Sequence, residues 1–518
     1  MKRTLLLISL LALPCMVSSG MEDNAKGTVV SEPAAVSDDK LTQLQKEFEL
    51  TDEEKIVFSA GVEGNTDALV NLKKEYLVNY YCIGAIAAGH TEQVRQCLGK
   101  GADLTISLEV AAWCGHMDIV QLLLEQGTQV NYGLLGAAKG GHTDIVLFML
   151  DKGATNFDGG LEAAAEGGHT DIIQLILEKG ATDFDGGLLG AAQYGHTDIV
   201  LFMLEKGATN FDGGLWAAAG GGHTDIIQLM LEKGATNFDG GLLGAAQYGH
   251  MDIVRLMLEK GATNYNEGLE RAALGGHSDI VLLMLEKVAT DYNEGLEWAA
   301  LGGHSDIVRL MLEKGATNYN EGLKWAALYG HSDIVRLMLE KGATNYNEGL
   351  ERAIDEGYME IVELMLEKGA EPNAGLERAI KCNNMHIVEL LVEKGADPNI
   401  GLQWAIWYNH SDIVMFLLEK GATNYTEALA DAAWSGHMAI VKLLLEKGAD
   451  PNEGLIRAVM MEHTDILKLL LAQPGIDVNK QDSDGRTPLD RAEDIGSTEC
   501  AELIRAAGGK RSNEIESM

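Results

Sequence analysis

The chain has 518 residues, of which 46% are hydrophobic and only 6% aromatic. This length predicts several domains or an array of repeats rather than one core. A formal net charge of -38 argues against binding to nucleic acid or to anionic membranes, which need clustered Lys and Arg, and it favours solubility and basic protein partners.

The first residues have the pattern of a secretory signal peptide. Lys2 and Arg3 precede an apolar run from Leu5 to Leu13, and small residues follow at Ser18-Ser19-Gly20. A charged start, an apolar centre and a small-residue cleavage site are typical of such signals. We therefore expect residues 1–20 to direct export, to the periplasm or out of the cell, and then to be removed. No later apolar run reaches the ~18 residues of a membrane span, so we expect no membrane insertion.

The remaining chain divides by composition and periodicity. Polar residues dominate up to about Lys40, which predicts a flexible linker. The expected segments are a linker at 21–40, N-terminal capping helices with a degenerate repeat at 41–80, a repeat array at 81–473, a C-terminal capping repeat at 474–508 and a disordered tail at 509–518.

Five cysteines follow the predicted cleavage site, an odd number with no paired spacing. This pattern argues against a disulfide framework and against a zinc site. Cys82, Cys97 and Cys500 stand where neighbouring repeats carry Leu or Ile, so we expect them to be packed thiols.

A Gly-His pair marks an internal repeat. His277, His304 and His331 are 27 residues apart, whereas His437 and His463 are 26 residues apart. Counting degenerate ends, the chain holds about seventeen such units. The slot is filled at His90, His116, His142, His169, His196, His223, His250, His277, His304, His331, Tyr358, Asn384, His410, His437 and His463.

Each unit is predicted to hold two helices. The first, expected to be the shorter, is exemplified by residues 295–302, where Leu296, Ala299 and Ala300 have the i, i+3, i+4 spacing of one apolar face. The second spans about 305–314.

The second helix carries its own start and stop. Ser305 and Asp306 are predicted to cap its N-terminus, and Gly315 to close it in the left-handed conformation. A pair of this size cannot bury its apolar surface alone, so the units must stack on one another.

The repeats resemble the ankyrin-repeat family. The matching pattern is Leu-x-x-Ala-Ala-x-x-Gly-His-x-x-Ile-Val-x-x-x-Leu-x-x-Gly-Ala, which runs from Leu296 to Ala316 and recurs over about residues 56–508. Ankyrin units are usually about 33 residues long and include a β-hairpin finger, and the internal units here lack about six residues at that place. Only the last unit keeps a fuller form, from Asp482 to Leu489. The resemblance implies an all-α, ankyrin-like α-solenoid of stacked helix–turn–helix repeats, forming a curved rod with reduced fingers.

The recurring histidines suggest a row of metal ligands at first sight. Two ligands of one Zn²⁺ must both come within about 2.1 Å of it, whereas equivalent residues in neighbouring units should be ~10 Å apart. We therefore interpret the histidine as a turn residue that hydrogen-bonds backbone between helices, and we expect no metal and no cofactor. The sequence also lacks a nucleophile elbow, a phosphate-binding loop and a His-Glu-x-x-His helix.

The tryptophans point to a binding surface. All seven stand in predicted first helices, and Trp298 and Leu301 are spaced i, i+3 opposite the apolar face. By the resemblance, these helices line the concave side, and Trp, Tyr and Arg dominate binding hot spots. The alternative is that the rings only fill the groove between neighbouring repeats. The candidate partner-binding residues are Trp216, Arg271, Trp298, Leu301, Trp325, Leu328, Tyr329, Arg352, Arg378, Trp404, Trp407, Tyr408 and Trp434.

A tandem duplication bears on the same choice. Residues 134–187 and 188–241 are near copies of two units each. Four of their differences, among them Glu162/Trp216 and Glu166/Gly220, lie in first helices away from the Leu/Ala face. Such changes favour a binding role, although drift on a tolerant surface gives the same pattern.

Together these features predict a non-enzymatic, exported and monomeric scaffold that binds one or more proteins on its concave face. In a host-associated bacterium the partners would include host proteins, an expectation that rests on the family resemblance alone. A periplasmic partner or inhibitor of a resident protein is an alternative of the same class. A structural spacer rod and an enzyme are alternatives of other classes.

Overall fold

The computed structural model describes residues 52–63 and 75–516. Within these residues every regular element is an α-helix and no strand occurs. The helices pair in tandem along the chain, which confirms the predicted all-α solenoid. The predicted signal peptide at 1–20, the linker at 21–40 and the start of the capping region lie outside the described residues.

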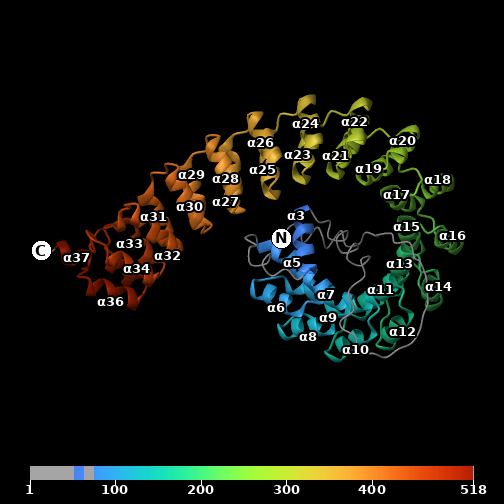
Figure 1. The fold of residues 1–518 in the computed structure, drawn as a ribbon, viewed down its shortest axis with the longest axis horizontal. Helices are drawn as coiled ribbons and strands as arrows, with labels where there is room; N and C mark the ends of the chain where they lie inside the picture. The colour runs from blue at the N-terminus through green and yellow to red at the C-terminus, as the bar shows by residue number, and fades with distance from the viewer. Residues whose placement is uncertain (1–51, 64–74, 517–518) are drawn as a thin grey trace. The chain divides into compact units, whose positions relative to one another are not determined.

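The helices form two compact units, residues 1–290 and 291–518. Within each unit, first helices lie in one row and second helices in another (Figure 1). In residues 1–290 the first helices are α3 (Asp52–Val62), α5 (Glu75–Ala87), α7 (Leu104–Cys114), α9 (Val130–Gly140), α11 (Phe157–Gly167), α13 (Phe184–Tyr194), α15 (Phe211–Gly221), α17 (Phe238–Tyr248) and α19 (Tyr265–Gly275). The second helices are α6 (Thr91–Gly99), α8 (Met117–Glu125), α10 (Thr143–Asp151), α12 (Thr170–Glu178), α14 (Thr197–Lys206), α16 (Thr224–Lys233), α18 (Met251–Lys260) and α20 (Ser278–Glu286).

Residues 291–518 continue the same alternation. The first helices are α21 (Tyr292–Gly302), α23 (Tyr319–Tyr329), α25 (Tyr346–Glu356), α27 (Pro372–Lys381), α29 (Pro398–Trp407), α31 (Tyr425–Ser435), α33 (Pro451–Met460) and α35 (Pro488–Asp494). The second helices are α22 (Ser305–Lys314), α24 (Ser332–Lys341), α26 (Met359–Glu367), α28 (Met385–Glu393), α30 (Ser411–Glu419), α32 (Met438–Glu446), α34 (Thr464–Leu471) and α36 (Thr498–Ala506), and a last helix α37 spans Ser512–Glu516.

The relative lengths of the two helices correct the sequence prediction. First helix α21 has 11 residues, one more than second helix α22 with 10. The first helix is longer than expected because it begins at Tyr292, before the expected start at residue 295. Its first turn holds Glu294, which suits the positive end of the helix dipole.

The start of the second helix also differs from the prediction. The cap position of α22 is occupied by His304, and Ser305 and Asp306 are the first helical residues. The prediction of Ser305 and Asp306 as caps is therefore wrong, although Asp306 still brings negative charge to the first turn. The predicted stop is confirmed: Gly315 has a φ of 107° and its N–H donates to Leu312 and Met311 carbonyls.

The core lies between the two rows. Leu296, Ala299 and Ala300 of α21 are completely buried. From α22, Ile307 and Met311 are also completely buried. Full burial of a side chain such as Ile307 or Met311 contributes roughly 1.5–3 kcal/mol to stability. The alanines let the two helices of one repeat approach closely.

A side chain from the preceding repeat holds the turn between neighbouring repeats. The Oδ1 atom of Asn320 accepts hydrogen bonds from the backbone N–H groups of Thr344 (2.7 Å) and Asn345 (3.1 Å). These N–H groups precede a helix and have no intrahelical partner. The first of these two hydrogen bonds is also accepted by Asp158, Asp185, Asp212, Asp239, Asn266, Asn293, Asn347, Asn373 and Asn399. At Asp158 the two backbone hydrogen bonds lower the pKa of the carboxyl group.

The last repeat has the fuller form that the sequence predicts. Thr487 and Asp490 form a reciprocal capping box at the start of α35. The N–H of Asp482 donates to the carbonyl of Arg486 (3.0 Å), which closes a tight turn before it.

The segment after this repeat differs from the expected disordered tail at 509–518. Lys510 N–H donates to Asn479 Oδ1 (2.7 Å), and Ser512 N–H, at the first residue of α37, donates to Asp490 Oδ2 (3.0 Å). Residues 509–516 are thus attached to the last repeat by side-chain-to-backbone hydrogen bonds, which a composition-based prediction does not take into account.

Candidate functional site

The first helices of neighbouring repeats meet in a constant register. We number positions from the buried leucine, so that in α27 Leu376 precedes Arg378 at position 2 and Lys381 at position 5. Arg378 pairs with Asp355 at position 5 of the preceding first helix, with a 2.6 Å hydrogen bond from Nη1 to Oδ1. Position 2 therefore faces back toward the preceding repeat.

Two further arginines confirm this register. Arg271 Nη1 donates to Gln247 Oε1 (3.4 Å), again from position 2 to position 5. Arg457 lies over the ring of Trp434, with 5.5 Å from its guanidinium carbon to the ring centroid.

The three arginines predicted as partner-binding residues have partners within the chain. Besides the contacts of Arg271 and Arg378 just described, Arg378 Nε lies 3.4 Å from Glu351. Arg352 lies 4.0 Å from Glu348 on its own helix. These side chains bridge neighbouring first helices or, in the case of Arg352, brace one helix.

The tryptophans at position 2 are half-buried. Trp298, Trp325 and Trp404 are each partly exposed. Lys324 Nζ lies 5.0 Å from the centroid of the Trp325 ring. Trp404 stacks on Tyr408 with centroids 6.3 Å apart and planes inclined by 25°.

The leucines and the tyrosine next to these rings are also partly exposed. Leu301, Leu328 and Tyr329 lie at the C-terminal ends of α21 and α23. The backbone carbonyl of Leu301 accepts a hydrogen bond from His331 (3.0 Å). These three residues border the row of first helices.

The remaining predicted tryptophans differ in exposure. Trp407 at position 5 of α29 is 72% exposed, whereas Trp434 at position 5 of α31 is 38% exposed. Trp216 at position 1 of α15 is 40% exposed. Trp407 is thus by far the most exposed of the three rings.

Helix α29 brings several exposed apolar side chains together. Ile400, Trp404 and Trp407 have i, i+4, i+7 spacing and lie on one face of the helix. Ile400 is 40% exposed, and α29, with the sequence PNIGLQWAIW, contains no charged residue. The sequence prediction missed Ile400, although this spacing and the Glu at the equivalent place in most neighbouring repeats could have revealed it.

Charged residues flank this stripe. Helix α27 carries Glu377 and Lys381, and α31 carries Glu427 and Asp431, all four exposed. Although Asp431 is exposed, partial desolvation by the neighbouring groups raises the pKa of its carboxyl group, against the opposing effect of Arg457. An apolar centre with a charged rim has the anatomy of a protein interface.

The comparison with protein families decides the identity of the repeats. The family model described as "Ankyrin repeats (3 copies)" matches seven stretches, some of which overlap: residues 108–186, 188–268, 215–295, 242–321, 296–375, 376–454 and 429–513.

The chain belongs to the ankyrin-repeat family.

Ankyrin repeats imply protein partners, so the chain is a protein–protein interaction scaffold. The family is typically non-enzymatic. No curated protein matches the chain.

The ankyrin histidines form an inter-repeat row. His196 Nε2 lies 3.0 Å from the carbonyl oxygen of Glu166, and its ring covers Gly168 so closely that a Cβ there would lie 2.6 Å from Cε1. This contact confirms the interpretation as a turn residue that hydrogen-bonds backbone between helices. The same backbone contact is made by His90, His116, His142, His169, His223, His250, His277, His331 and His463.

Two of these imidazoles have a lowered pKa. Burial lowers the pKa of His250 and of His331, and the neighbouring His223 and His277 add to the effect at His250. Within residues 52–63 and 75–516, no group of three His, Cys, Asp or Glu side chains is arranged to hold a metal ion.

The cysteines behave as packed thiols. Cys82, Cys97 and Cys500 are completely buried, as predicted from their positions. A hydrogen bond with Cys82, together with burial, raises the pKa of the Cys97 thiol. Cys382 is exposed.

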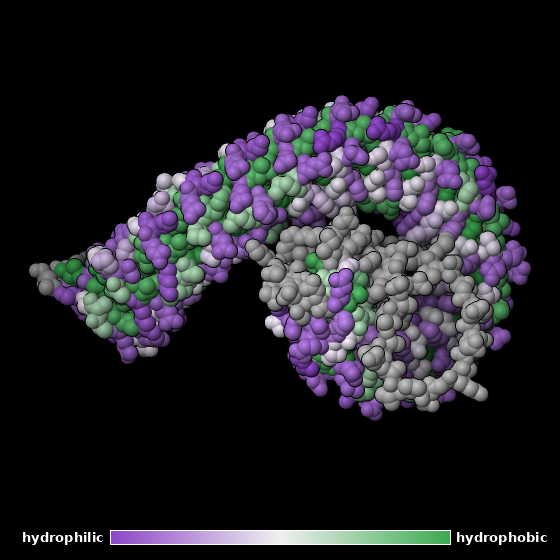
Figure 2. All heavy atoms as spheres, in the orientation of Figure 1, coloured by the Kyte–Doolittle hydropathy of each residue, from purple (hydrophilic) through white to green (hydrophobic). Residues whose placement is uncertain are grey.

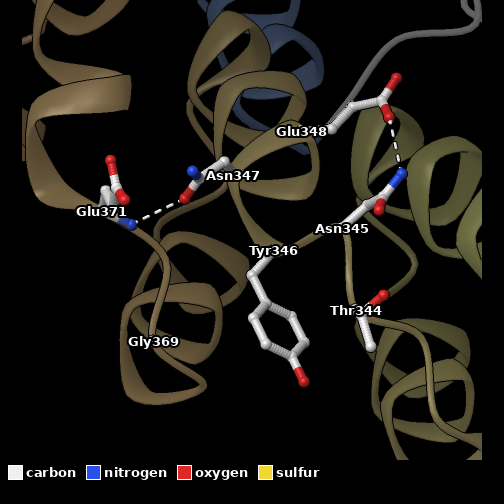
Figure 3. A pocket seen from close by; sticks show the side chains of 7 residues that line it. All are labelled: Thr344, Asn345, Tyr346, Asn347, Glu348, Gly369 and Glu371. Atoms are coloured by element: carbon white, nitrogen blue, oxygen red, sulfur yellow. Dashed lines mark hydrogen bonds between the residues drawn. The ribbon is translucent and has the colours of Figure 1, made fainter.

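A shallow depression of about 430 Å³ lies at the turn edge of the C-terminal unit. It is lined by Thr344, Asn345, Tyr346, Asn347, Glu348, Gly369 and Glu371. Asn347 Oδ1 accepts from the N–H of Glu371 (2.7 Å), and Tyr346 points away from Glu348 (Figure 3). The side-chain amide of Asn347 holds the turn. Among the lining residues no nucleophile stands beside a base.

Among the described helices, none combines the length and the apolar character needed to cross a membrane.

Proposed function

We propose that this ankyrin-repeat protein is an exported, monomeric scaffold that holds a basic partner protein on the first helices of its C-terminal unit. The binding centre is the stripe formed by Ile400, Trp404 and Trp407 on α29. Arg271, Arg352 and Arg378 then serve to shape the surface rather than to contact the partner.

The observation that carries this proposal is the exposure of Trp407. An indole that leaves 72% of its surface in water contributes little to stability where it stands. Buried in an interface, a tryptophan is among the most effective anchors. The absence of charge from α29 adds to this, because charged residues are depleted at the centres of interfaces.

The preference for a basic partner rests on charge. The chain carries 78 acidic and 40 basic residues, and Glu377, Glu427 and Asp431 lie on the helices beside the stripe. In Figure 2 the visible face of the C-terminal unit shows hydrophobic stripes between hydrophilic ones. A cationic partner is attracted to such a surface, whereas an anionic protein is repelled from it.

Export rests on the sequence of residues 1–20 alone. Its order of charged, apolar and small residues is that of a secretory signal. N-terminal sequencing of the protein recovered from the producing cells tests this part, with a mature N-terminus near Met21 as the expected result and an intact Met1 as the contrary one.

The binding proposal is tested by affinity recovery with the purified mature chain. The double variant Trp404→Ala/Trp407→Ala should lose the proteins that the wild type recovers while its helical content is unchanged. The matched control is Leu147→Ala/Leu201→Ala, which removes side chains of 49% and 46% exposure from second helices. Equal recovery by both double variants would contradict the assignment of the surface to α29.

A further inference from the structure

The molecule contains its own example of a cation held on a tryptophan. In the pair α31 and α33, Trp434 at position 5 is covered by Arg457 at position 2 of the next repeat, 5.5 Å from the ring centroid. A guanidinium over an indole face is a favourable cation–π contact. The contact leaves Trp434 38% exposed.

The preceding pair of helices has the same tryptophan without the cation. Trp407 stands at position 5 of α29, and position 2 of α31 is Asp431. The register seen for Arg271, Arg378 and Arg457 places Asp431 beside Trp407. Because a carboxylate cannot cover an indole face as a cation does, Trp407 keeps an exposure of 72%.

We propose that Trp407 and Asp431 form a subsite for an arginine side chain of the partner protein. The guanidinium plane stacks on the Trp407 indole while its N–H groups donate to the Asp431 carboxylate. The subsite rests on the proposed binding function and specifies one contact of it. The arginine takes the place that Arg457 occupies on Trp434.

The chemistry favours arginine over other side chains. A planar guanidinium both stacks on aromatic rings and pairs with carboxylates through two parallel hydrogen bonds, whereas the lysine ammonium is a strongly hydrated point charge. Glu427 lies on the same helix as Asp431, and its negative charge acts on Asp431 and also attracts a cation. Arg457 also acts on Asp431, but its guanidinium lies over Trp434.

The subsite is tested by fluorine NMR of the full chain labelled with 5-fluorotryptophan. The Trp407 signal is assigned by its loss in Trp407→Phe. N-acetyl-arginine methylamide should shift this signal saturably, and the neutral citrulline analogue should not. Asp431→Asn should weaken the response about fivefold, the scale of an exposed cation–π and ion-pair contact. An unchanged response in Asp431→Asn, or an equal response to citrulline, would overturn the subsite.

Two exchange variants add a test that goes in both directions. Asp431→Arg should shift the Trp407 signal without ligand and abolish its response, because the chain then supplies its own cation. Arg457→Asp should uncover Trp434 and give that signal a new response to the arginine probe. If circular dichroism shows that Asp431→Arg does not fold, Arg457→Asp alone tests the proposal. A Trp434 signal that does not respond to the arginine probe in that variant contradicts it.

Failure of the subsite and failure of the proposed function have different signatures. A partner protein recovered through Trp407, with no response to the arginine probe, would reject the subsite and leave the binding function. A specific response to the probe, with no protein recovered by the wild type, would support the subsite and count against the binding function.

Discussion

The first helices of α9–α17 and of α23–α33 use the same register with opposite choices at position 2. In the first group position 2 is Gly or Ala, and a Cβ at Gly136 would lie 2.1 Å from the carbonyl oxygen of Glu109. In the second group it is mostly Arg or Trp, as at Arg378 and Trp404. The N-terminal group thus brings backbone against backbone, and the C-terminal group inserts a layer of side chains.

This difference shows how one repeat provides two kinds of surface. The buried leucine and the alanine at position 3 are the same in both groups, whereas the buried position 4 is Ala in the first group and Ile or Val in α25, α27, α29 and α33. Where position 2 is Gly, little side-chain surface is left between neighbouring helices. Where it is large, the side chains of positions 2 and 5 form the outer surface, and their chemistry is free to vary for binding.

The largest expected effect compares two tryptophans at position 5. Trp113 of α7 is 7% exposed, and Trp407 of α29 is 72% exposed. Trp113→Ala should destabilise the N-terminal unit by about 3–5 kcal/mol because it empties a packed site. Trp407→Ala should change the free energy of unfolding by less than about 0.5 kcal/mol. Amide hydrogen exchange of each unit measures both, and a large loss for Trp407→Ala would assign that ring to packing.

Addition of a methyl group at position 2 should give the next largest effect. Gly136→Ala places a Cβ against the Glu109 carbonyl and should cost about 1–3 kcal/mol, even though alanine is the better helix former by about 1 kcal/mol. The matched change is Arg352→Ala at position 2 of α25, which removes only a 4.0 Å ion pair and should cost less than about 0.5 kcal/mol. Urea denaturation monitored by hydrogen exchange compares the loss in free energy of unfolding between the two variants. Equal losses would mean that the two groups of helices pack alike.

The contact of Arg378 with Asp355 should have a smaller effect. A double-mutant cycle with Arg378→Ala and Asp355→Ala should give a coupling of about 1 kcal/mol, since the 2.6 Å hydrogen bond joins two partly buried charges. A coupling energy near zero would contradict the packing role of Arg378 and make it again a candidate for contact with the partner.

The smallest expected effect is a pH dependence of the histidine row. Burial lowers the pKa of His250 in the folded chain, so the unfolded chain binds the proton more readily. The stability contributed by the neutral imidazole is therefore present above the unfolded pKa of about 6.5 and is lost as pH falls below it. Hydrogen exchange in α17 and α18 at pH 7 and pH 5.5 measures this loss of stability. His250→Asn should flatten the dependence, and a steeper one would contradict the assignment.

Most of the fold was predictable because the repeat is local. The periodicity of residues such as Leu296, Ala299 and Ile307 depends only on which face of a helix is buried. The histidine contact was also predictable in kind, since repeats ~10 Å apart cannot share a metal ion. The helix starts were not, because His304 and Ser305 both precede the same apolar run, and Tyr292 lies in a stretch with the composition of a turn.

The candidate site was predictable only in part. The residue types at Trp404 and Trp407 were visible, but exposure depends on the residue that the next repeat places against each ring. Trp434 is covered by Arg457, whereas the residue at the corresponding position after Trp407 is Asp431, and this register emerges only when neighbouring helices are seen together. The arginines looked like binding residues for the same reason, since the sequence does not show that Arg378 reaches Asp355 in the preceding repeat.

Site-specific photo-crosslinking shows directly whether a partner protein binds at α29. The full chain carries p-benzoyl-phenylalanine at position 407 in one variant and at position 147 in another, both exposed sites, and each is irradiated with the protein mixture used for affinity recovery. Position 407 should give discrete adducts that disappear when unlabelled wild-type chain is added in excess, and position 147 should give none. No adduct from 407, or the same adducts from both positions, would contradict binding at α29.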